Sequence, residues 1–514
     1  MDTDVLIVGA GPTGLMLANQ LARRGVRVTI VDRSSGPAQQ TRAMAVHART
    51  LEIYQRLGVA ERALELGQVG GAANMWANGK RRARIPIGDI GRDLSPFPYV
   101  LMLGQDDNER VLGAHLAQWK VAVQWNTELV ALEQTGDGVA ATLKQPDGST
   151  RKTTAAWLAG CDGGRSTVRE RLGIGFPGAP YEHVFFVADT EATGSMVPGD
   201  LNVYLLREGF HLFFPMRGKD RWRVIGILPE RLRGRHDLTF EETVPAIRSE
   251  ADAHVAFKRC SWFSTYRIHH RRAERFRKER CFLLGDAAHV HSPMGGQGMN
   301  TGLQDAYNLA WKLAAVVQGK ADARLLDSYE AERIPVAERL LQTTDRAFSL
   351  IVSDTWTAAL FRTRIMARIA ASAMRIPRVR RAAFLTISQT GIRYPRSPLS
   401  RTSGDLPPDA PQPGDRFPWL RLRLRAGGPV EDLFRALDDL RWHLLVFGDG
   451  DAEPGDGVER HVLPVDPDNR RELERARIPP QSFFLLRPDG HVGLAGTRPE
   501  PQTIARYLAE AGMR

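Results

Sequence analysis

A glycine-rich segment near the start of the chain has the residue types and spacing that suit a bound dinucleotide. Gly9-Ala10-Gly11-Pro12-Thr13-Gly14 follows the G-x-G-x-x-G pattern. In that pattern the first glycine permits a tight turn, the second lets the backbone approach a pyrophosphate, and the third lets helix and strand pack closely. Asp32 follows Gly14 by 18 residues, where a carboxylate accepts hydrogen bonds from a ribose diol. The segment predicts a dinucleotide site but does not by itself distinguish FAD from NAD.

A second glycine-rich segment, residues 281–300, selects FAD. It begins as an apolar strand, turns at Gly285-Asp286 and leads into a helix that begins near Asn300. The loop residues that leave room for a close approach are Pro293, Gly296 and Gly298. Reduction of an isoalloxazine places negative charge on its pyrimidine side, which the N–H donors and dipole of a helix amino terminus stabilise. Asp286 is placed to accept from a ribityl hydroxyl, so we predict non-covalently bound FAD.

The elements that must position these residues are readable from the apolar pattern. Val5–Val8 is uniformly apolar, as in a strand buried on both faces of a parallel sheet. A helical pattern runs from Leu15 to Ala22, and a second strand, Val26–Val31, ends in Asp32. The order strand, glycine turn, helix, strand and acid predicts a Rossmann-like α/β domain.

Composition excludes several classes of protein. The chain has 514 residues, 43% of them hydrophobic, with a formal net charge of +11 and a pI near 9.8. Of its 70 basic residues only nine are Lys, a skew better explained by coding bias than by nucleic-acid binding, and Arg267–Arg280 lacks the interleaved aromatics of a single-strand binder. Three cysteines without a CxxC pair indicate a reducing cytoplasm. The most apolar later stretch, 358–374, is broken by arginines, so no signal peptide or membrane span is expected.

Three spaced motifs together resemble the class A flavoprotein aromatic hydroxylases. They are Gly9–Gly14, Cys161-Asp162-Gly163-Gly164-Arg165-Ser166 and Gly285–Asn300. Gly302–Leu313 and Leu326–Arg333 are also similar to that family, and the resemblance covers essentially the whole chain. The family includes para-hydroxybenzoate hydroxylase, phenol hydroxylase and the hydroxylases that tailor aromatic polyketides.

The resemblance implies roles for particular residues. Arg42 matches an arginine beside the flavin that accompanies ring movement, Gln105 a contact of the FAD sugar region, and Asp162 a position linked to both FAD and NADPH. Met299-Asn300 matches the pyrimidine edge, and Arg33 is expected at the adenosine or a phosphate. The residues expected at the cofactor are Gly9, Gly11, Pro12, Thr13, Gly14, Asp32, Arg33, Arg42, Gln105, Asp162, Asp286, Pro293, Gly296, Gly298, Met299 and Asn300. Those expected to act in catalysis are Arg42, Pro293 and His211.

The implied reaction is hydroxylation of an aromatic substrate, phenolic or polycyclic and polyketide-like. NADPH or NADH reduces FAD, oxygen forms a flavin C4a-hydroperoxide, and hydroxyl is transferred to an electron-rich arene or enol. Two alternatives on the same scaffold stay open: Baeyer–Villiger oxygen insertion and oxygenation of a large antibiotic-like substrate. A protein that keeps FAD without turnover is a further alternative. A serine hydrolase is set aside because no G-x-S-x-G elbow follows a strand, and a flavin halogenase because its tryptophan-rich signature is missing.

Residues 179–270 predict an inserted antiparallel sheet that covers the flavin and excludes water. Alternation in Gly209–Pro215 puts His211 and Phe213 on one face and Phe210, Leu212 and Phe214 on the other. His211 facing the substrate would orient or deprotonate a phenol, although a sheet histidine facing solvent is the slightly favoured interpretation. The residues predicted to line the substrate are His211, Phe213, Trp222 and Tyr204, with Tyr266 as a further candidate.

Two other sets of residues admit structural interpretations. His289 and His291 form an HxH pair, but no nearby set of ligands completes a metal site, so they are expected to be structural and no metal is predicted. Asp162 and Arg165 are expected either to serve the cofactor or to form an ion pair that closes a loop.

We predict four segments. They are the first part of the FAD-binding domain at 1–178, the substrate-binding sheet at 179–270, the second part with a helical region at 271–400, and a carboxyl-terminal unit at 415–514. The αβ pattern of the last resembles the thioredoxin-like tail of phenol-hydroxylase relatives. It contains no cysteine, so disulfide exchange is excluded there, and a structural or homodimer-contact role is expected.

Overall fold

Parallel strands bring the two glycine-rich segments to one edge of a sheet. β1 (Thr3–Val8) lies between β2 (Val28–Val31) and β11 (Thr150–Gly160), and β18 (Cys281–Leu283) pairs with the other side of β11. The strand order is β17-β18-β11-β1-β2-β8, with β10 also paired to β11 and β9 paired to β10. Because β1 and β18 run in the same direction, the turns that follow them leave from the same edge.

The computed structural model describes residues 1–39, 43–207, 209–232, 234–235, 237–250, 254–292, 294–352, 355–448 and 455–514. Arg42 and Pro293, both predicted to be catalytic, lie outside the described residues.

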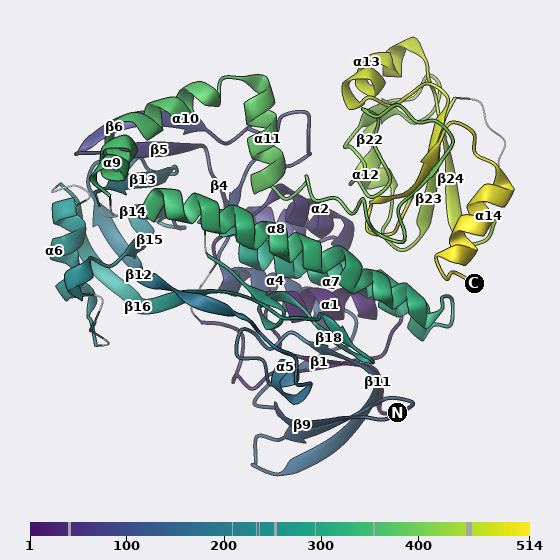
Figure 1. Ribbon diagram of the computed structural model, residues 1–514, viewed down its shortest axis with the longest axis horizontal. Helices are drawn as coiled ribbons and strands as arrows, with labels where there is room; N and C mark the ends of the chain where they lie inside the picture. Colours follow the sequence, from purple (N-terminus) through teal and green to yellow (C-terminus); the bar gives the residue numbers. More distant parts are fainter. Residues whose placement is uncertain are drawn as a thin grey trace.

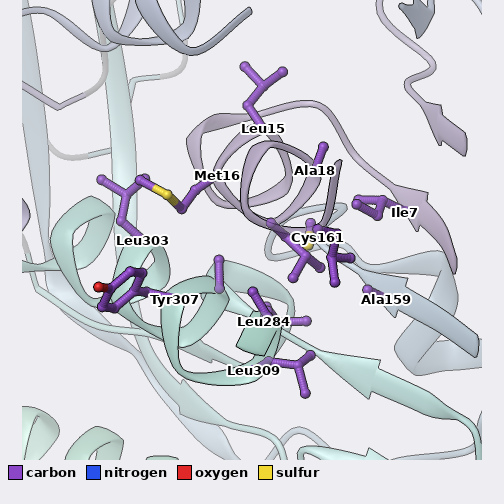
Figure 2. Close-up of a cluster of buried hydrophobic side chains, with 14 of the residues drawn as sticks. Ile7, Leu15, Met16, Ala18, Ala159, Cys161, Leu284, Leu303, Tyr307 and Leu309 are labelled. Carbon is purple, nitrogen blue, oxygen red and sulfur yellow. The ribbon is translucent and has the colours of Figure 1, made fainter. Parts of the chain in front are cut away.

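Two helices close the core beside these strands. α1 (Pro12–Ala22) and α7 (Gln297–Val317) pack against one another through Met16 and Leu303, and Figure 2 shows their side chains meeting those of β1 and β11. α8 (Asp327–Val352) runs beside α7 and ends at the second sheet (Figure 1). Val5–Val8 of β1 is buried in this core, as its uniformly apolar sequence predicted.

The second sheet has the order β19-β16-β12-β15-β14-β13-β5-β6. Its strands are β5 (Ala72–Ala77), β6 (Lys80–Pro86), β12 (Gly178–Thr193), β13 (Leu201–Leu206), β14 (Gly209–Pro215), β15 (Arg221–Ile227), β16 (Ala256–Arg272) and β19 (His289–Val290). The sheet is therefore wider than the 179–270 segment predicted from the sequence. β5 joins it because it pairs in parallel with β13, and β19 joins by pairing with β16. β19 also carries the second glycine-rich segment directly onto this sheet.

The two faces of this sheet have different neighbours. On the first, Phe240 and Ile247 of α6 (Phe240–Glu250) pack among the sheet residues, and we call it the α6 face. On the second, Ala367 of α10 (Ala367–Ala373) packs against β5 and β13, and we call it the α10 face. α8 also contacts β14 and β16, and Glu338 of α8 lies 3.2 Å from Arg272 at the end of β16.

A third sheet forms the carboxyl-terminal unit, with the order β20-β26-β25-β23-β24. Its elements are β20 (Arg401–Ser403), β23 (Trp442–Phe447), β24 (Val458–Leu463), β25 (Ser482–Leu486), β26 (Val492–Gly496), α12 (Leu433–Ala436), α13 (Pro467–Ala476) and α14 (Pro501–Glu510). These strands and helices agree with the αβ pattern predicted for this unit, although α12 is a single turn. Trp442 meets Trp311 of α7, with ring centroids 5.6 Å apart, so this unit packs on the flavin-binding body.

The remaining elements connect these sheets. They are β3 (Ala45–Val46), α2 (Ala48–Leu57), α3 (Ala60–Leu66), β4 (Gln68–Val69), β7 (Leu101–Met102), α4 (Gln105–Ala117), β8 (Val123–Gln124), β9 (Glu128–Gln134), β10 (Val139–Lys144), α5 (Thr167–Arg171), β17 (Arg277–Lys278), α9 (Trp356–Leu360), α11 (Pro377–Ile387), β21 (Arg421–Arg423) and β22 (Val430–Asp432), with short helical turns at Glu230–Leu232, Gly285–Ala287, Met294–Gly296, Ala323–Leu326 and Phe361–Met366. Among the described residues, no helix combines the length and apolar character needed to cross a membrane.

Candidate active site

In the first glycine turn, protein atoms lie close to Gly9 and Gly14 and leave free space beside Gly11. A Cβ on Gly9, whose φ is +104°, would lie 2.8 Å from the backbone nitrogen of Asp162. A Cβ on Gly14 would lie 3.1 Å from the carbonyl carbon of Gly9 and closer still to its oxygen. A Cβ on Gly11 would have no protein atom within 4 Å. The space over Gly11, at the amino terminus of α1, is therefore what a pyrophosphate requires.

Asp32 ties the end of β2 to this turn. One carboxylate oxygen accepts from the Ala10 backbone N–H at 2.7 Å, and the other accepts from the Ser34 backbone N–H at 2.8 Å. Each oxygen has a second lone pair, so Asp32 keeps acceptor capacity for a ribose. Arg33 is exposed.

Gln105 is the first residue of α4 and donates to a neighbouring carboxylate. Its Nε2 lies 2.9 Å from Oε1 of Glu109, whose Oε2 accepts from the Ala38 backbone N–H at 2.7 Å. Burial raises the pKa of Glu109. Glu109 was not among the residues expected at the cofactor, yet it fixes both Gln105 and the loop after β2.

Thr13 joins the first glycine turn to the second. Its Oγ1 lies 2.7 Å from the position of a Cβ on Gly285, a residue with φ +57°. A Cβ on Gly302 would also meet Thr13 and would lie 3.1 Å from the Cα of Gly285. Thr13 therefore fills a gap that only glycines leave, and the two glycine segments predicted from the sequence form a single site.

Asp305 of α7 holds the second glycine turn from inside the protein. Its Oδ2 accepts from the Gly285 backbone N–H at 3.0 Å and contacts Nε2 of His289 at 2.8 Å, while Oδ1 accepts from Nε of Arg333 at 2.6 Å. Burial alone would raise the pKa of Asp305, but the Arg333 guanidinium and His289 bring it below its ordinary value. Asp286 itself is exposed beside this turn. Asp305 lies in the Gly302–Leu313 segment that resembles the family, but its role was not predicted from the sequence.

The histidine pair of this loop is built into the protein. The rings of His289 and His291 lie 6.2 Å apart and nearly parallel, and Nδ1 of His291 lies 2.9 Å from the Ser292 carbonyl oxygen. Burial lowers the pKa of His291 to about 4. These contacts agree with the structural interpretation of the HxH pair.

The amino terminus of α7 presents backbone rather than side chains. Gly295 and Gly296 have φ of +73° and +63°, and no acidic residue lies in the first helical turn. Asn300 is fully buried and all of its amide is used: Oδ1 accepts from His47 N–H at 2.9 Å and from Thr50 Oγ1 at 2.8 Å, and Nδ2 donates to the carbonyls of Ala45 and Gly296, each at 2.8 Å.

Two other predicted residues lie at the same helix start. Met299 accepts a contact from Nδ2 of Asn108 at 3.5 Å, and a Cβ on Gly298 would lie 3.3 Å from the His291 ring. The side chain of Asn300 therefore orders the loop at the start of α7.

Asp162 supports α5. It accepts from the Ser166 hydroxyl at 2.5 Å and from the Val168 backbone N–H at 3.1 Å, and burial raises its pKa. Arg165 is exposed, and the arginine that closes this loop is Arg169, which donates to the carbonyls of Ala287 and Gly164, each at 2.9 Å. The sequence had no signal for Arg169, which ties the Asp162 loop to the second glycine turn.

The four residues predicted to line the substrate lie together, but in a core. Tyr204, His211, Phe213 and Trp222 are 0–4% exposed and point to the α6 face. Burial lowers the pKa of His211 to about 3, so it stays neutral at physiological pH. The alternation in β14 was predicted correctly, and contact of these four side chains with a substrate stays a prediction.

The α10 face carries the other half of the alternation. Phe185, Phe210 and Ile227 form a cluster there, with Tyr181, Leu212 and Tyr266 partly buried against it. On the same face Arg223 is fully buried and binds Asp189 through two hydrogen bonds of 2.6 Å. Among the described residues, Nη1 of Arg223 has no hydrogen-bond partner.

Comparison with known proteins identifies the family. Residues 2–344 match the family of the FAD-binding domain. The 6-methylpretetramide 4-monooxygenase of Streptomyces rimosus is 36% identical over 98% of this chain and 92% of its own length. The rifampicin monooxygenase of Streptomyces venezuelae is 35% identical over 96% of this chain and 95% of its own. The structure of aklavinone-11 hydroxylase with FAD and aklavinone superposes with a TM-score of 0.80, 28% identity and 99% coverage of both chains.

The chain therefore belongs to the FAD-binding family of flavoprotein monooxygenases. It is a flavin-dependent enzyme that uses a reduced nicotinamide and molecular oxygen, and the resemblance inferred from its three motifs is confirmed.

Proposed function

We propose that this enzyme hydroxylates a phenolic or polycyclic, polyketide-like aromatic compound bound between the α10 face of the second sheet and the flavin. The observation that carries the proposal is the aromatic cluster of that face, on a sheet that β19 joins to the second glycine turn. A planar, apolar ring system suits such a surface. The relatives named for 6-methylpretetramide and aklavinone support this substrate class.

The contacts of the two glycine turns indicate which residues would hold each part of FAD. Gly11 and the start of α1 would receive the pyrophosphate, Asp32 a ribose, Asp286 the ribityl chain, and the backbone N–H groups of α7 the pyrimidine edge. The predicted contacts with less direct support are Arg33, Gln105 and Asp162, because Gln105 and Asp162 already bond within the protein. Bound FAD supplies the reduction of oxygen and the transfer of one oxygen atom; the protein holds, orients and shields the reactants.

Arg223 is the polar group on the α10 face best placed to select an anionic oxygen. Its Nε and Nη2 are held by Asp189, which leaves Nη1 as a donor with its geometry fixed. A phenolate or enolate oxygen accepts well from a guanidinium, and orienting it in this way would favour attack on the adjacent ring carbon. Among the predicted catalytic residues, His211 would instead act as a neutral core residue.

Removal of the Arg223 charge tests this role. We expect Arg223→Met to keep FAD while kcat/KM for the substrate falls about 10- to 100-fold, the equivalent of one charge-assisted hydrogen bond. Arg221→Met is the matched control, because Arg221 is exposed on the same strand. Equal kinetics for both variants, with FAD retained, would remove Arg223 from substrate binding.

The reaction itself is tested by substrate-stimulated turnover. NADPH and NADH oxidation and oxygen uptake are followed together, with and without a panel of phenols, naphthoquinones and polycyclic aromatics. Stimulation by one class supports hydroxylation, and the better reductant identifies the nicotinamide. A flavin that neither nicotinamide reduces would favour FAD binding without turnover.

Oxygenation of a large antibiotic-like compound is the second candidate, favoured by the similarity to rifampicin monooxygenase. Baeyer–Villiger insertion gives the same product mass as hydroxylation, so NMR connectivity of the product separates the two.

We propose that residues 415–514 form a thioredoxin-like domain without cysteines. It follows the flavin-domain segments at 1–178 and 271–400 and the substrate sheet at 179–270 in the chain. Its packing on α7 through Trp442 and Trp311 supports a structural role. Sedimentation velocity of the full chain tests whether it also forms a homodimer.

A further inference from the structure

We propose that His443, Glu459 and His461 in the carboxyl-terminal unit form a binding site for a divalent transition-metal ion such as Zn²⁺. The parallel pairing of β23 and β24 places these side chains together. His443 lies opposite Glu459 in the register, and His461 is two residues beyond Glu459. Because side chains alternate along a strand, all three project from the same face.

The ligand atoms are close enough to share one ion. Nδ1 of His443 and Nε2 of His461 are 3.1 Å apart, and Glu459 lies 3.9 Å from the first through Oε2 and 3.9 Å from the second through Oε1. At Zn–N bonds of about 2.05 Å, two nitrogens at this separation subtend about 98° at a common ion, between octahedral and tetrahedral values. The carboxylate would need to move by about 0.5 Å to complete a His₂Glu set.

The Asp438 carbonyl determines which ring nitrogen of His443 can bind a metal ion. Nε2 lies 2.9 Å from the Asp438 carbonyl oxygen, which can only accept, so Nε2 carries the proton. Nδ1 therefore directs a lone pair at His461. This arrangement, a ligand histidine that donates its other N–H to a backbone carbonyl, is the usual surrounding of a metal-bound imidazole.

An ion has access to this position and competes there with an arginine. β24 is the end strand of its sheet, and the side chains of Glu459 and His461 are 39% and 19% exposed. Solvent can therefore supply the remaining coordination positions. Nη1 of Arg441 lies 2.9 Å from Oε2 of Glu459, so metal binding must draw this carboxylate away from Arg441.

The proposed metal site lies far from the glycine turns that would hold FAD, and close to the contact between the carboxyl-terminal unit and α1. Asp439, next to the Asp438 carbonyl, pairs with Arg23 at 3.0 Å, and Arg23 directly follows α1. α1 spans about 16 Å from this end to the glycine turn. The ion would therefore stabilise the attachment of this unit to α1 rather than react with the substrate.

The experiment uses the full-length, tag-free holoenzyme after dialysis against a chelator. Calorimetric titration with Zn²⁺ and visible spectroscopy with Co²⁺ are expected to show one ion per chain, with a rise in the melting temperature. His461→Ala should weaken Zn²⁺ binding at least about 10- to 100-fold, and Arg441→Gln should strengthen it. His254→Ala, an exposed histidine elsewhere, is the matched control.

If His461→Ala folds poorly, Glu459→Gln replaces it, since an amide can still accept from Arg441. The proposal is overturned if the wild-type protein binds no Zn²⁺. It is also overturned if the stoichiometry and affinity of the His461 or Glu459 variant equal those of His254→Ala.

Discussion

Alanine at Gly11 and at Gly14 should separate cofactor approach from protein packing. The two glycines belong to one turn, but a Cβ on Gly11 meets no protein atom within 4 Å, whereas one on Gly14 lies 3.1 Å from the carbonyl carbon of Gly9. The methyl group of Gly11→Ala therefore makes no steric clash in the folded protein and occupies only the space at the amino terminus of α1. The methyl group of Gly14→Ala must displace backbone.

The magnitudes follow from these contacts. For Gly11→Ala we expect an unchanged free energy of unfolding of the apoprotein and a loss of one charge-assisted contact to the pyrophosphate, about 1.5–3 kcal/mol. That loss corresponds to about a 10- to 150-fold higher Kd for FAD. For Gly14→Ala we expect the apoprotein itself to lose about 3 kcal/mol, the upper end of ordinary overpacking, because backbone is less yielding than a side chain.

Two assays and one control measure this difference. Urea unfolding of the apoproteins gives stability, and quenching of flavin fluorescence gives the Kd. Gly113→Ala is the control, because Gly113 lies in α4 with nothing within 4 Å of its Cβ position, so alanine should raise stability by up to about 1 kcal/mol without touching FAD. A wild-type Kd in Gly11→Ala would refute the placement of the pyrophosphate, and wild-type stability in Gly14→Ala would refute the packing argument.

Two other perturbations test the buried charges. Asp305→Asn leaves Arg333 without its carboxylate and should lower the free energy of unfolding by about 3–5 kcal/mol and weaken FAD binding; a loss below about 1 kcal/mol in urea titrations would contradict the assigned role. His211 has a folded-state pKa of about 3, so between pH 6.5 and 3 the unfolded chain binds the extra proton and stability falls as pH falls. From pH 6.5 to 5 this one residue should lower the free energy of unfolding by about 2 kcal/mol. Unfolding curves of His211→Gln should therefore lack this part of the pH dependence. An equal pH dependence in both proteins would show that His211 is charged when folded.

The nucleotide motif was predictable because its determinants are local. Val5–Val8, the glycine turn and α1 follow one another in the chain, and each residue type there answers a backbone requirement. The second segment was equally readable. Its contact with the first through Thr13 could be expected only from a resemblance, because no local pattern records a contact between residues so far apart.

The proposed substrate face could not be chosen from the sequence. Alternation in β14 separates His211 and Phe213 from Phe210 and Leu212, but both sets are apolar or aromatic. Only tertiary packing decides what covers each set: Phe213 lies in the cluster that α6 covers, and Phe210 lies in a cluster with Phe185 and Ile227. Likewise Asp305 and Arg169 are ordinary charged helix residues in the sequence. Their roles depend on carbonyl and amide groups supplied by other elements.

The contact of Thr13 with Gly285 and Gly302 also determines when the protein can be completed during synthesis. At roughly 5–20 residues per second, the ribosome takes about 15–60 s to proceed from Thr13 to Gly302. For part of that interval, from the completion of β11 at Gly160 to the synthesis of β18 at Cys281, the edge of β11 that will receive β18 has no partner, and an unpaired apolar strand edge promotes aggregation. FAD cannot protect the nascent chain, because half of its site has not been made. The yield of soluble enzyme should therefore depend more on slow, cool expression or chaperones than on added flavin.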